Sequence, residues 1–241
     1  MVADLFLRTY PGDYAWLPFL FRSLARHARG WRRLVVVTPT GNLYPLVGVD
    51  PRLPIVYCNC SHYTDDYVGQ QITKLRAEEY TDADEICYLD SDLVLLKALT
   101  PDTLRAPSGK LILETREWSE SGQALAAWFN VTKTLLGEVE PPFETMARHP
   151  FQYPTAFVTR VWDSVRRVML FPNQKISEFN LLGNYAYLYE PDLFEFRNVG
   201  AIGDSIASPR EGDIVRQFWS RGGITAEVAA ELMGLGYLGI P

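Results

Sequence analysis

The chain has 241 residues, a net charge of −6 and 47% apolar residues. These values indicate a soluble globular protein, and they exclude a broad basic field for nucleic acid or an anionic membrane. The opening residues, MVADLFLRTY, contain an acid and no long apolar run. We therefore expect no signal peptide, no membrane helix and a cytoplasmic location. An odd number of cysteines (Cys58, Cys60 and Cys87) favours reduced thiols in that compartment.

The first 115 residues predict alternating strands and helices. Strands are expected at 3–10, 34–38, 54–59, 85–90 and 110–114, and helices at 14–28 and 69–80. Pro11-Gly12-Asp13 marks a turn in which Asp13 could cap the first helix. This order is typical of a Rossmann-like α/β fold, an open and mainly parallel sheet flanked by helices.

After residue 115 the pattern is less regular. Helices are expected at 121–136, from Thr155, at 177–189 and at 225–236, with a proline-bounded loop around 149–154 and a short strand at 193–198. Ser177 is placed to cap its helix. Because no linker separates the halves, we predict one domain over 1–241, whose first half (1–115) resembles a nucleotide-binding fold and whose second half spans 116–241.

Asp90 ends the apolar strand at 85–90, and Asp92 follows it after one serine. If the chain stays extended, both carboxylates point the same way at the carboxyl end of a parallel strand, where α/β sheets bind ligands. Two such carboxylates repel each other unless a cation lies near them. Mg²⁺ and Mn²⁺ prefer oxygen ligands, so a metal–diphosphate complex accounts for the pair. The alternative is a polar turn whose aspartates cap backbone N–H groups.

The stretch YLDSDLVL (88–95) resembles the Asp-x-Asp signature of GT-A-fold glycosyltransferases. The same letters fit the nucleophile motif of haloacid-dehalogenase-type phosphatases, with Asp90 as nucleophile. In those enzymes the motif follows the first strand, whereas here about ninety residues precede it. GDSIAS (203–208) lacks the second aspartate of their later acidic motif. The transferase hypothesis therefore ranks first, and a non-catalytic nucleotide-sugar binder remains a third.

Four other stretches resemble small bacterial and phage GT-A-like proteins: RTY (8–10), GQQITKL (69–75), SEFNLLGNYA (177–186) and RQFWS (216–220). The resemblance implies a nucleotide-diphosphate sugar donor, with a UDP-sugar as first choice, held by Arg8, Thr9, Tyr10, Gln71, Lys74, Asp90, Ser91, Trp219 and Ser220. It implies Mn²⁺ or Mg²⁺ on Asp92 and Asp90, an acceptor-binding half over 116–241, and Glu178 as general base in a hexosyl or pentosyl transfer. Proton removal by Glu178 would invert the anomeric centre, and a retaining outcome stays open. No histidine lies late in the chain, so water, diphosphate oxygens or a late group such as Asp204 or Asp213 could complete the metal shell.

Several of these residues also have a purely structural explanation. Lys74 and Glu78 are four residues apart and could form a surface ion pair. Glu178 follows a helix cap, where the macrodipole favours any carboxylate. For the acceptor site we name His149, Tyr153 and Asn180, although a histidine beside a proline is more often structural.

The acceptor is expected to be the hydroxyl of a small molecule or glycan. The phage resemblance adds hydroxymethylated bases in phage DNA as an alternative, with a location in the host cytoplasm. Contacts to DNA phosphates would come from the basic segments 22–33 and 160–167, Arg166 and Arg167 above all.

Overall fold

The computed structural model describes residues 1–41, 53–118, 126–146, 149–168, 176–199, 212–218 and 220–237. Its centre is a five-stranded mixed sheet with the strand order β3-β2-β1-β4-β7. The strands are β1 (Ala3–Arg8), β2 (Leu34–Pro39), β3 (Ile55–Cys60), β4 (Glu85–Leu89) and β7 (Phe151–Pro154). The first four are parallel, and β7 pairs antiparallel with β4. The predicted α/β class with a mainly parallel sheet is confirmed.

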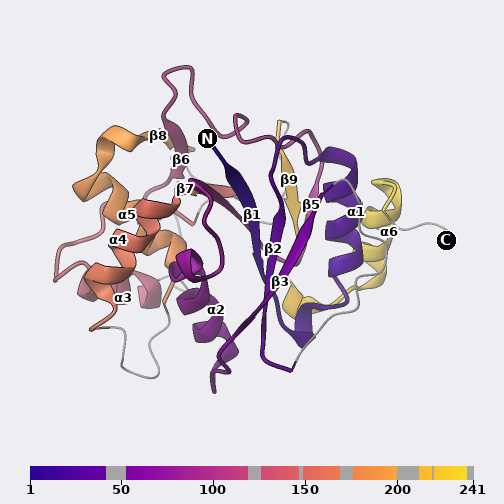
Figure 1. Cartoon of the computed structure of the whole chain (residues 1–241), viewed down its shortest axis with the longest axis horizontal. Coiled ribbons are helices and arrows are strands. Elements are labelled where there is room, and N and C mark those ends of the chain that lie inside the picture. Colours follow the sequence, from indigo (N-terminus) through magenta and orange to yellow (C-terminus); the bar gives the residue numbers. More distant parts are fainter. Residues whose placement is uncertain are drawn as a thin grey trace.

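Helices cover both faces of the sheet, because every residue of β1, β2 and β4 is buried and each strand offers apolar side chains on both sides. Leu5 and Leu7 face the cluster that contains α1, whereas Phe6 faces the cluster that contains α2, α4 and α5. The helices are α1 (Leu17–His27), α2 (Asp66–Leu75), α3 (Ala126–Leu135), α4 (Thr155–Val165), α5 (Glu178–Tyr189) and α6 (Ala226–Gly234). Figure 1 shows α1 and α6 on one side and α2 to α5 on the other.

Two smaller sheets complete the fold. β5 (Leu93–Leu95) pairs antiparallel with β9 (Val215–Gln217), and β6 (Leu111–Thr115) pairs parallel with β8 (Phe194–Asn198). α6 packs through Leu232 into a cluster with Trp16 and Phe218, and the latter two rings are stacked at 5.7 Å. The β5–β9 pair and this cluster bring the C-terminal segment back beside the turn that carries Asp90 and Asp92.

The structure corrects the prediction of the fifth strand. Residues 110–114 were expected to join the main sheet, but β6 forms its own pair with β8. The position beside β4 is taken by β7, from a stretch predicted as a loop. The short strand β5 was not predicted. β7 has only four residues and ends at Pro154, so its pairing with β4 has no local sequence signal.

Helix α5 is fixed by a side-chain clamp. The Oδ1 atom of Asn180 accepts hydrogen bonds from the backbone N–H groups of Thr145 (2.7 Å) and Met146 (3.2 Å). Asn184, one turn later, binds both the N–H and the C=O of Phe143. A Cβ at Gly183 would lie 2.3 Å from Thr145 Oγ1, so only glycine permits this approach. The clamp gives a structural reason for much of SEFNLLGNYA.

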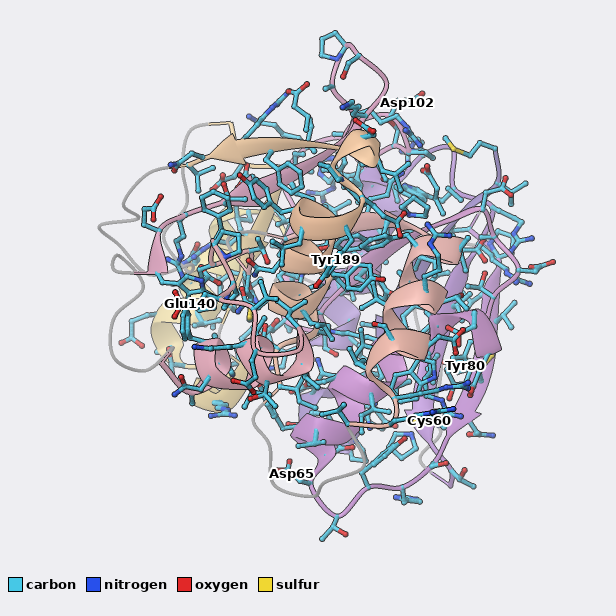
Figure 2. The ribbon with its side chains drawn as sticks, turned by 90° about the vertical axis from the view of Figure 1, so that its left-hand side faces the viewer. Cys60, Asp65, Tyr80, Asp102, Glu140 and Tyr189 are labelled. Atoms are coloured by element: carbon cyan, nitrogen blue, oxygen red, sulfur yellow. The ribbon has the colours of Figure 1, made fainter. Side chains whose placement is uncertain are left out.

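Figure 2 views the face formed by these helices, where α5, marked by Tyr189, lies beside α4. Asp65 lies near the lower edge of that view, where α2 begins, and its side chain accepts hydrogen bonds from the N–H groups of Tyr67 and Val68. In the part of the chain that is described, no helix is both long and apolar enough to cross a bilayer. All three cysteines carry free thiols.

Candidate functional site

The residues that could take part in binding or catalysis lie at the carboxyl ends of β1 and β4. From β1 the chain moves to β2 and β3 on one side, and it then returns to place β4 on the other side of β1. This reversal is the switch point where open α/β sheets bind ligands. Asp90 to Asp92 follow β4, and Thr9 and Tyr10 follow β1. The two ends are joined by a hydrogen bond of 2.9 Å from Ser91 Oγ to Thr9 Oγ1.

Asp90 is held between two cationic or polar partners. Its Oδ1 accepts a hydrogen bond of 2.6 Å from Lys74 Nζ, and its Oδ2 lies 2.9 Å from His149 Nε2. Burial alone would raise the pKa of Asp90, but the charges of Lys74 and His149 outweigh it and hold the pKa well below its ordinary value. Asp90 is therefore an ionised carboxylate whose two oxygens both face groups of the protein.

Lys74 links Asp90 to Glu178. Its ammonium is buried, lies 2.8 Å from Glu178 Oε1 and stands 4.7 Å from the centre of the Phe179 ring. Burial would lower the pKa of Lys74, but the charges of Asp90 and Glu178 raise it above its ordinary value. The alternative of a surface ion pair with Glu78 is wrong, because the side chain of Lys74 points into the protein. Breaking the ion pairs between this buried cation and the two carboxylates is costly, because it leaves a buried charge without its partner.

Gln71 and the start of α5 complete this group. Gln71 Oε1 accepts a hydrogen bond of 3.0 Å from the N–H of Glu178, one of the free donors of the helix start. Ser177 caps the same helix by accepting from the N–H of Asn180 at 3.3 Å, which confirms its predicted role. Glu178 itself is only 2% exposed. We call Lys74, Asp90, Asp92, His149 and Glu178 the carboxyl-edge site.

Asp92 has a different environment from Asp90. Ser91 and Asp92 form a turn directly after Asp90, so the extended backbone on which the prediction of a shared side-chain direction depended is not found here. Asp92 Oδ2 accepts a hydrogen bond of 2.9 Å from the N–H of Ser220, whereas its buried Oδ1 has no partner among the described residues. Burial and the nearby charge of Asp90 raise the pKa of Asp92 to about 8. Its carboxylate is thus buried, incompletely paired and poorly disposed to carry its charge.

Sequence reasoning assigned no site role to two further carboxylates. Asp13 lies in the turn after β1, is 9% exposed and has a pKa raised to about 6 by burial, with Asp90 adding to the rise. It does not cap α1, whose N-cap position is Trp16. Asp66, in the first turn of α2, forms an ion pair with the buried guanidinium of Arg8. The Arg8 guanidinium also stands 6.0 Å from the ring of Tyr10. The sequence signal that could have identified Asp13 is its position in the loop directly after β1, at the edge of the sheet where ligands bind.

The three residues named for the acceptor are all buried. His149 contacts Asp90, and its ring packs edge-on against Phe151 and Phe179. Tyr153 is fully buried in the core beside β4. Asn180 belongs to the clamp on α5 and has no exposed surface. His149 therefore belongs to the carboxyl-edge site, whereas Tyr153 and Asn180 support the fold.

A divalent cation was expected on Asp92 and Asp90. Within the described residues, no three or more His, Cys, Asp or Glu side chains are grouped to hold a metal ion. The unpaired Oδ1 of Asp92 nevertheless fits such an ion, because a cation there would offset a buried charge that lacks a partner. Asp90 fits less well, since both of its oxygens already face Lys74 and His149.

The other predicted metal and donor residues lie in different places. Asp213 precedes β9 and lies at the far end of the β5–β9 pair, because Ile214 bonds to Leu96 while Phe218 bonds to the C=O of Asp92. It is therefore remote from Asp92. Asp204 and Trp219 lie outside the described residues.

Arginines of the first basic segment are engaged within the protein. Arg22 and Arg26 bind carbonyl groups after α6, Arg29 binds carbonyl groups at the end of α1, and Arg32 and Arg33 pair with Asp4 and Asp82. In the second segment, Arg160 pairs with Glu190 and Arg166 with Asp163. These contacts reduce the positive charge that either segment could offer to DNA.

Comparisons with known proteins add no family to this description: no protein-family model matches the sequence, and no curated protein matches it either.

Proposed function

We propose that the protein is a glycosyltransferase that moves a sugar from a nucleotide-diphosphate donor to an acceptor hydroxyl, on a GT-A-like variant of the α/β fold. The observation that carries the proposal is the position of Asp90 and Asp92 directly after β4, at the switch point of the sheet, with one buried oxygen of Asp92 unpaired. A carboxylate in that state is suited to a ligand that brings positive charge with it.

The path of the C-terminal segment supports the proposal. The resemblance to GT-A enzymes implies a late segment that returns over the donor. In this chain Phe218 bonds to the C=O of Asp92, and the N–H of Ser220 bonds to its Oδ2. Residues near 220 therefore lie against the turn that carries Asp90 and Asp92.

Asp92 is the residue best suited to hold Mn²⁺ or Mg²⁺. A bound cation would supply charge stabilisation for a departing diphosphate. Asp90 is kept ionised and oriented by Lys74 and His149, so it can accept hydrogen bonds from donor hydroxyls where its oxygens remain open. Thr9 and Ser91 hold the ends of β1 and β4 together beneath them.

Glu178 remains the proposed general base for the acceptor hydroxyl. Its Oε1 contacts Lys74, so the proton would have to be accepted by the other oxygen, Oε2. The same contact fixes the orientation of the carboxylate, because Lys74 is itself buried and held by Asp90.

The test is calorimetric binding of nucleoside diphosphates with Mn²⁺ or with a chelator, together with an assay for nucleoside diphosphate released from nucleotide sugars. We expect wild type to bind one diphosphate in a metal-dependent manner and Asp92→Asn to lose that dependence. Asp163→Asn, in an exposed ion pair on α4, serves as the control. Equal affinity of wild type with metal and with chelator would contradict the metal role.

The phosphatase hypothesis makes a separate prediction that the same preparation can test. A nucleophilic Asp90 needs a free oxygen, yet both of its oxygens face a cationic or imidazole nitrogen. Hydrolysis of a generic phosphate ester without a sugar donor, abolished by Asp90→Asn, would overturn the transferase proposal. A non-catalytic binder would show diphosphate affinity but no release from any nucleotide sugar.

The proposed acceptor is the hydroxyl of a small molecule or glycan. Modified DNA remains a lesser alternative, since Arg166 is exposed and its ion pair is with the exposed Asp163. Retention on hydroxymethylated duplex at low salt, weakened when Arg166 and Arg167 are both changed to Glu, would favour DNA.

A further inference from the structure

Arg221 lies at the edge of the carboxyl-edge site. It follows Ser220, whose N–H binds Asp92, in the short helical turn η6 (Ser220–Gly222). Its guanidinium carbon stands 5.9 Å from the centre of the Tyr67 ring, near the start of α2. The side chain is exposed, so it can meet a molecule that approaches from solvent.

Arg221 differs from the other cations of this region in having no carboxylate partner among the described residues. Arg8 is buried and committed to Asp66. Lys74 is buried and committed to Asp90 and to Glu178. If Lys74 turned to a ligand, Glu178 would be buried without its partner, which is strongly unfavourable, and the buried guanidinium of Arg8 cannot reach a molecule in solvent.

Two carboxylates lie beside Ser220, the residue before Arg221. Asp92 accepts a hydrogen bond from the N–H of Ser220, and Asp13 bonds to the side chain of Ser220. A doubly or triply charged diphosphate that enters this region meets strong repulsion. One divalent ion on Asp92 offsets only part of that charge, so a further cation that can leave its present contact is needed.

The field of Arg221 extends over both aromatic residues on this side. Burial raises the pKa of Tyr67, the charge of Glu178 adds to the rise, and Arg221 opposes it. Burial and Asp13 likewise raise the pKa of Tyr10, against an opposing effect of Arg221. The positive charge of Arg221 therefore acts on the region between the loop after β1 and the start of α2. This region lies next to Asp92.

We propose that Arg221 binds the diphosphate of the donor, as the cation that compensates for the acidic surroundings of Asp92. The inference rests on the proposed function and adds a binding residue that sequence reasoning did not name. The planar guanidinium can bond two phosphate oxygens at once, which a lysine cannot do in the same geometry. Release of the Tyr67 contact costs little, because a cation–π contact of an exposed guanidinium is weak.

The experiment compares nucleoside diphosphates with the matching nucleosides by calorimetry, in the presence of Mg²⁺. The proteins are wild type, Arg221→Ala, Arg221→Lys and the control Arg197→Ala, an exposed arginine paired with Glu195 on β8. We expect Arg221→Ala to lower diphosphate affinity about tenfold or more, the scale of charge-assisted hydrogen bonds, while nucleoside affinity changes less than about twofold. Arg221→Lys should recover part of the loss, and Arg197→Ala should match wild type.

The outcomes separate this inference from the proposal on which it rests. If wild type binds none of the nucleoside diphosphates, both are overturned. If wild type binds one and Arg221→Ala binds it equally well, the role of Arg221 alone is overturned. An equal loss of diphosphate and nucleoside affinity would also overturn it, since it would assign Arg221 to the base or to the shape of the loop. Because Arg221 is exposed, the variant should unfold at the same temperature as wild type. That result would show that a change in affinity does not come from a damaged fold.

Discussion

The two ends of the central sheet both contain buried carboxylates, but Asp4 at the amino end and Asp92 at the carboxyl end differ in how completely they are bonded. At the amino end, Asp4 accepts hydrogen bonds from Arg32, Arg33 and Thr81, at distances between 2.6 and 3.0 Å. Burial alone would raise the pKa of Asp4, but these bonds outweigh it and hold the pKa below its ordinary value. At the carboxyl end, the Oδ2 of Asp92 accepts a hydrogen bond from Ser220, its Oδ1 has no partner among the described residues, and its pKa is raised to about 8.

The difference shows which end is built for stability and which is built for a ligand. A fully bonded carboxylate such as Asp4 contributes to the folded state by itself. An incompletely bonded one such as Asp92 costs free energy until something with positive charge arrives. Perturbed carboxylates of this kind gather at functional sites. Four variants test this difference between the two ends, and they follow in order of decreasing expected effect.

Lys74→Met removes the cation that the carboxyl end does possess. Asp90 and Glu178 would then be buried without their shared partner, so we expect a loss of about 3 to 5 kcal/mol in the free energy of unfolding. Urea denaturation measures it. The control is Lys133→Met, since Lys133 lies 3.3 Å from the exposed Glu140 and its pair should contribute less than about 1 kcal/mol. Similar losses in the two variants would show that burial of the Lys74 cluster has no special energetic role.

Glu178→Gln tests whether the carboxyl end acts in turnover as well as in stability. A lost general base lowers kcat roughly a hundredfold or more, with donor affinity nearly unchanged. Steady-state kinetics and calorimetry give the two quantities. If donor affinity falls as much as kcat, Glu178 serves to hold Lys74 rather than to take a proton. A variant with near-normal turnover would make it only a helix-start anion.

Asp4→Asn removes the charge of the fully bonded carboxylate at the amino end of the sheet. It leaves Arg32 and Arg33 with a neutral partner, and we expect a loss of about 1 to 3 kcal/mol near pH 7. Because the pKa of Asp4 is depressed in the folded state, its contribution is present above the ordinary value of 3.8 and is lost as pH falls through the lower folded value. Wild type and variant should therefore converge in urea denaturation as the pH is lowered. A difference that stays constant down to pH 3 would exclude this charge effect.

Asp92→Asn should act in the opposite direction. The folded pKa of about 8 lies above the ordinary 3.8, so the contribution of the protonated form is present below pH 4 and is lost as pH rises through about 8. For the pH unit between 5 and 6, where the unfolded state alone has lost the proton, the variant should gain about 1.4 kcal/mol of stability relative to wild type, and the gain should continue as the pH approaches 8. Unfolding is measured in chelator, and added Mn²⁺ should stabilise wild type alone. A stability difference that does not change with pH would refute the raised pKa.

Most of the fold was predictable because its signals are local. The apolar runs of β1, β2 and β4, the cap at Ser177 and the start of α4 at Thr155 are all legible in a few neighbouring residues. β7 was missed because its strand character comes from its pairing with β4, which no neighbouring residue announces.

The site was predictable in position but not in its ionic arrangement. Asp90 and Asp92 are identified by their place after a buried strand, and sheet topology then fixes the edge at which they lie. The burial of Lys74, by contrast, depends on contacts with Asp90 and with Glu178, which is more than a hundred residues away in the sequence. The contact of His149 with Asp90 likewise depends on β7 lying beside β4, which the neighbouring residues do not predict.

β7 is synthesised after the four parallel strands of its sheet, so the sheet of the nascent chain is at first incomplete. A nascent chain that ends before Phe151 contains β1 to β4 but lacks the strand that pairs with β4. It also lacks α4 and α5, which cover Phe6, Ile86 and Tyr88 on one face of the sheet. On the ribosome, this N-terminal portion therefore presents an open strand edge and an apolar surface together, the combination that promotes aggregation and attracts chaperones. A shortened version of the protein that keeps only the Asp-x-Asp half should be poorly soluble for the same reason.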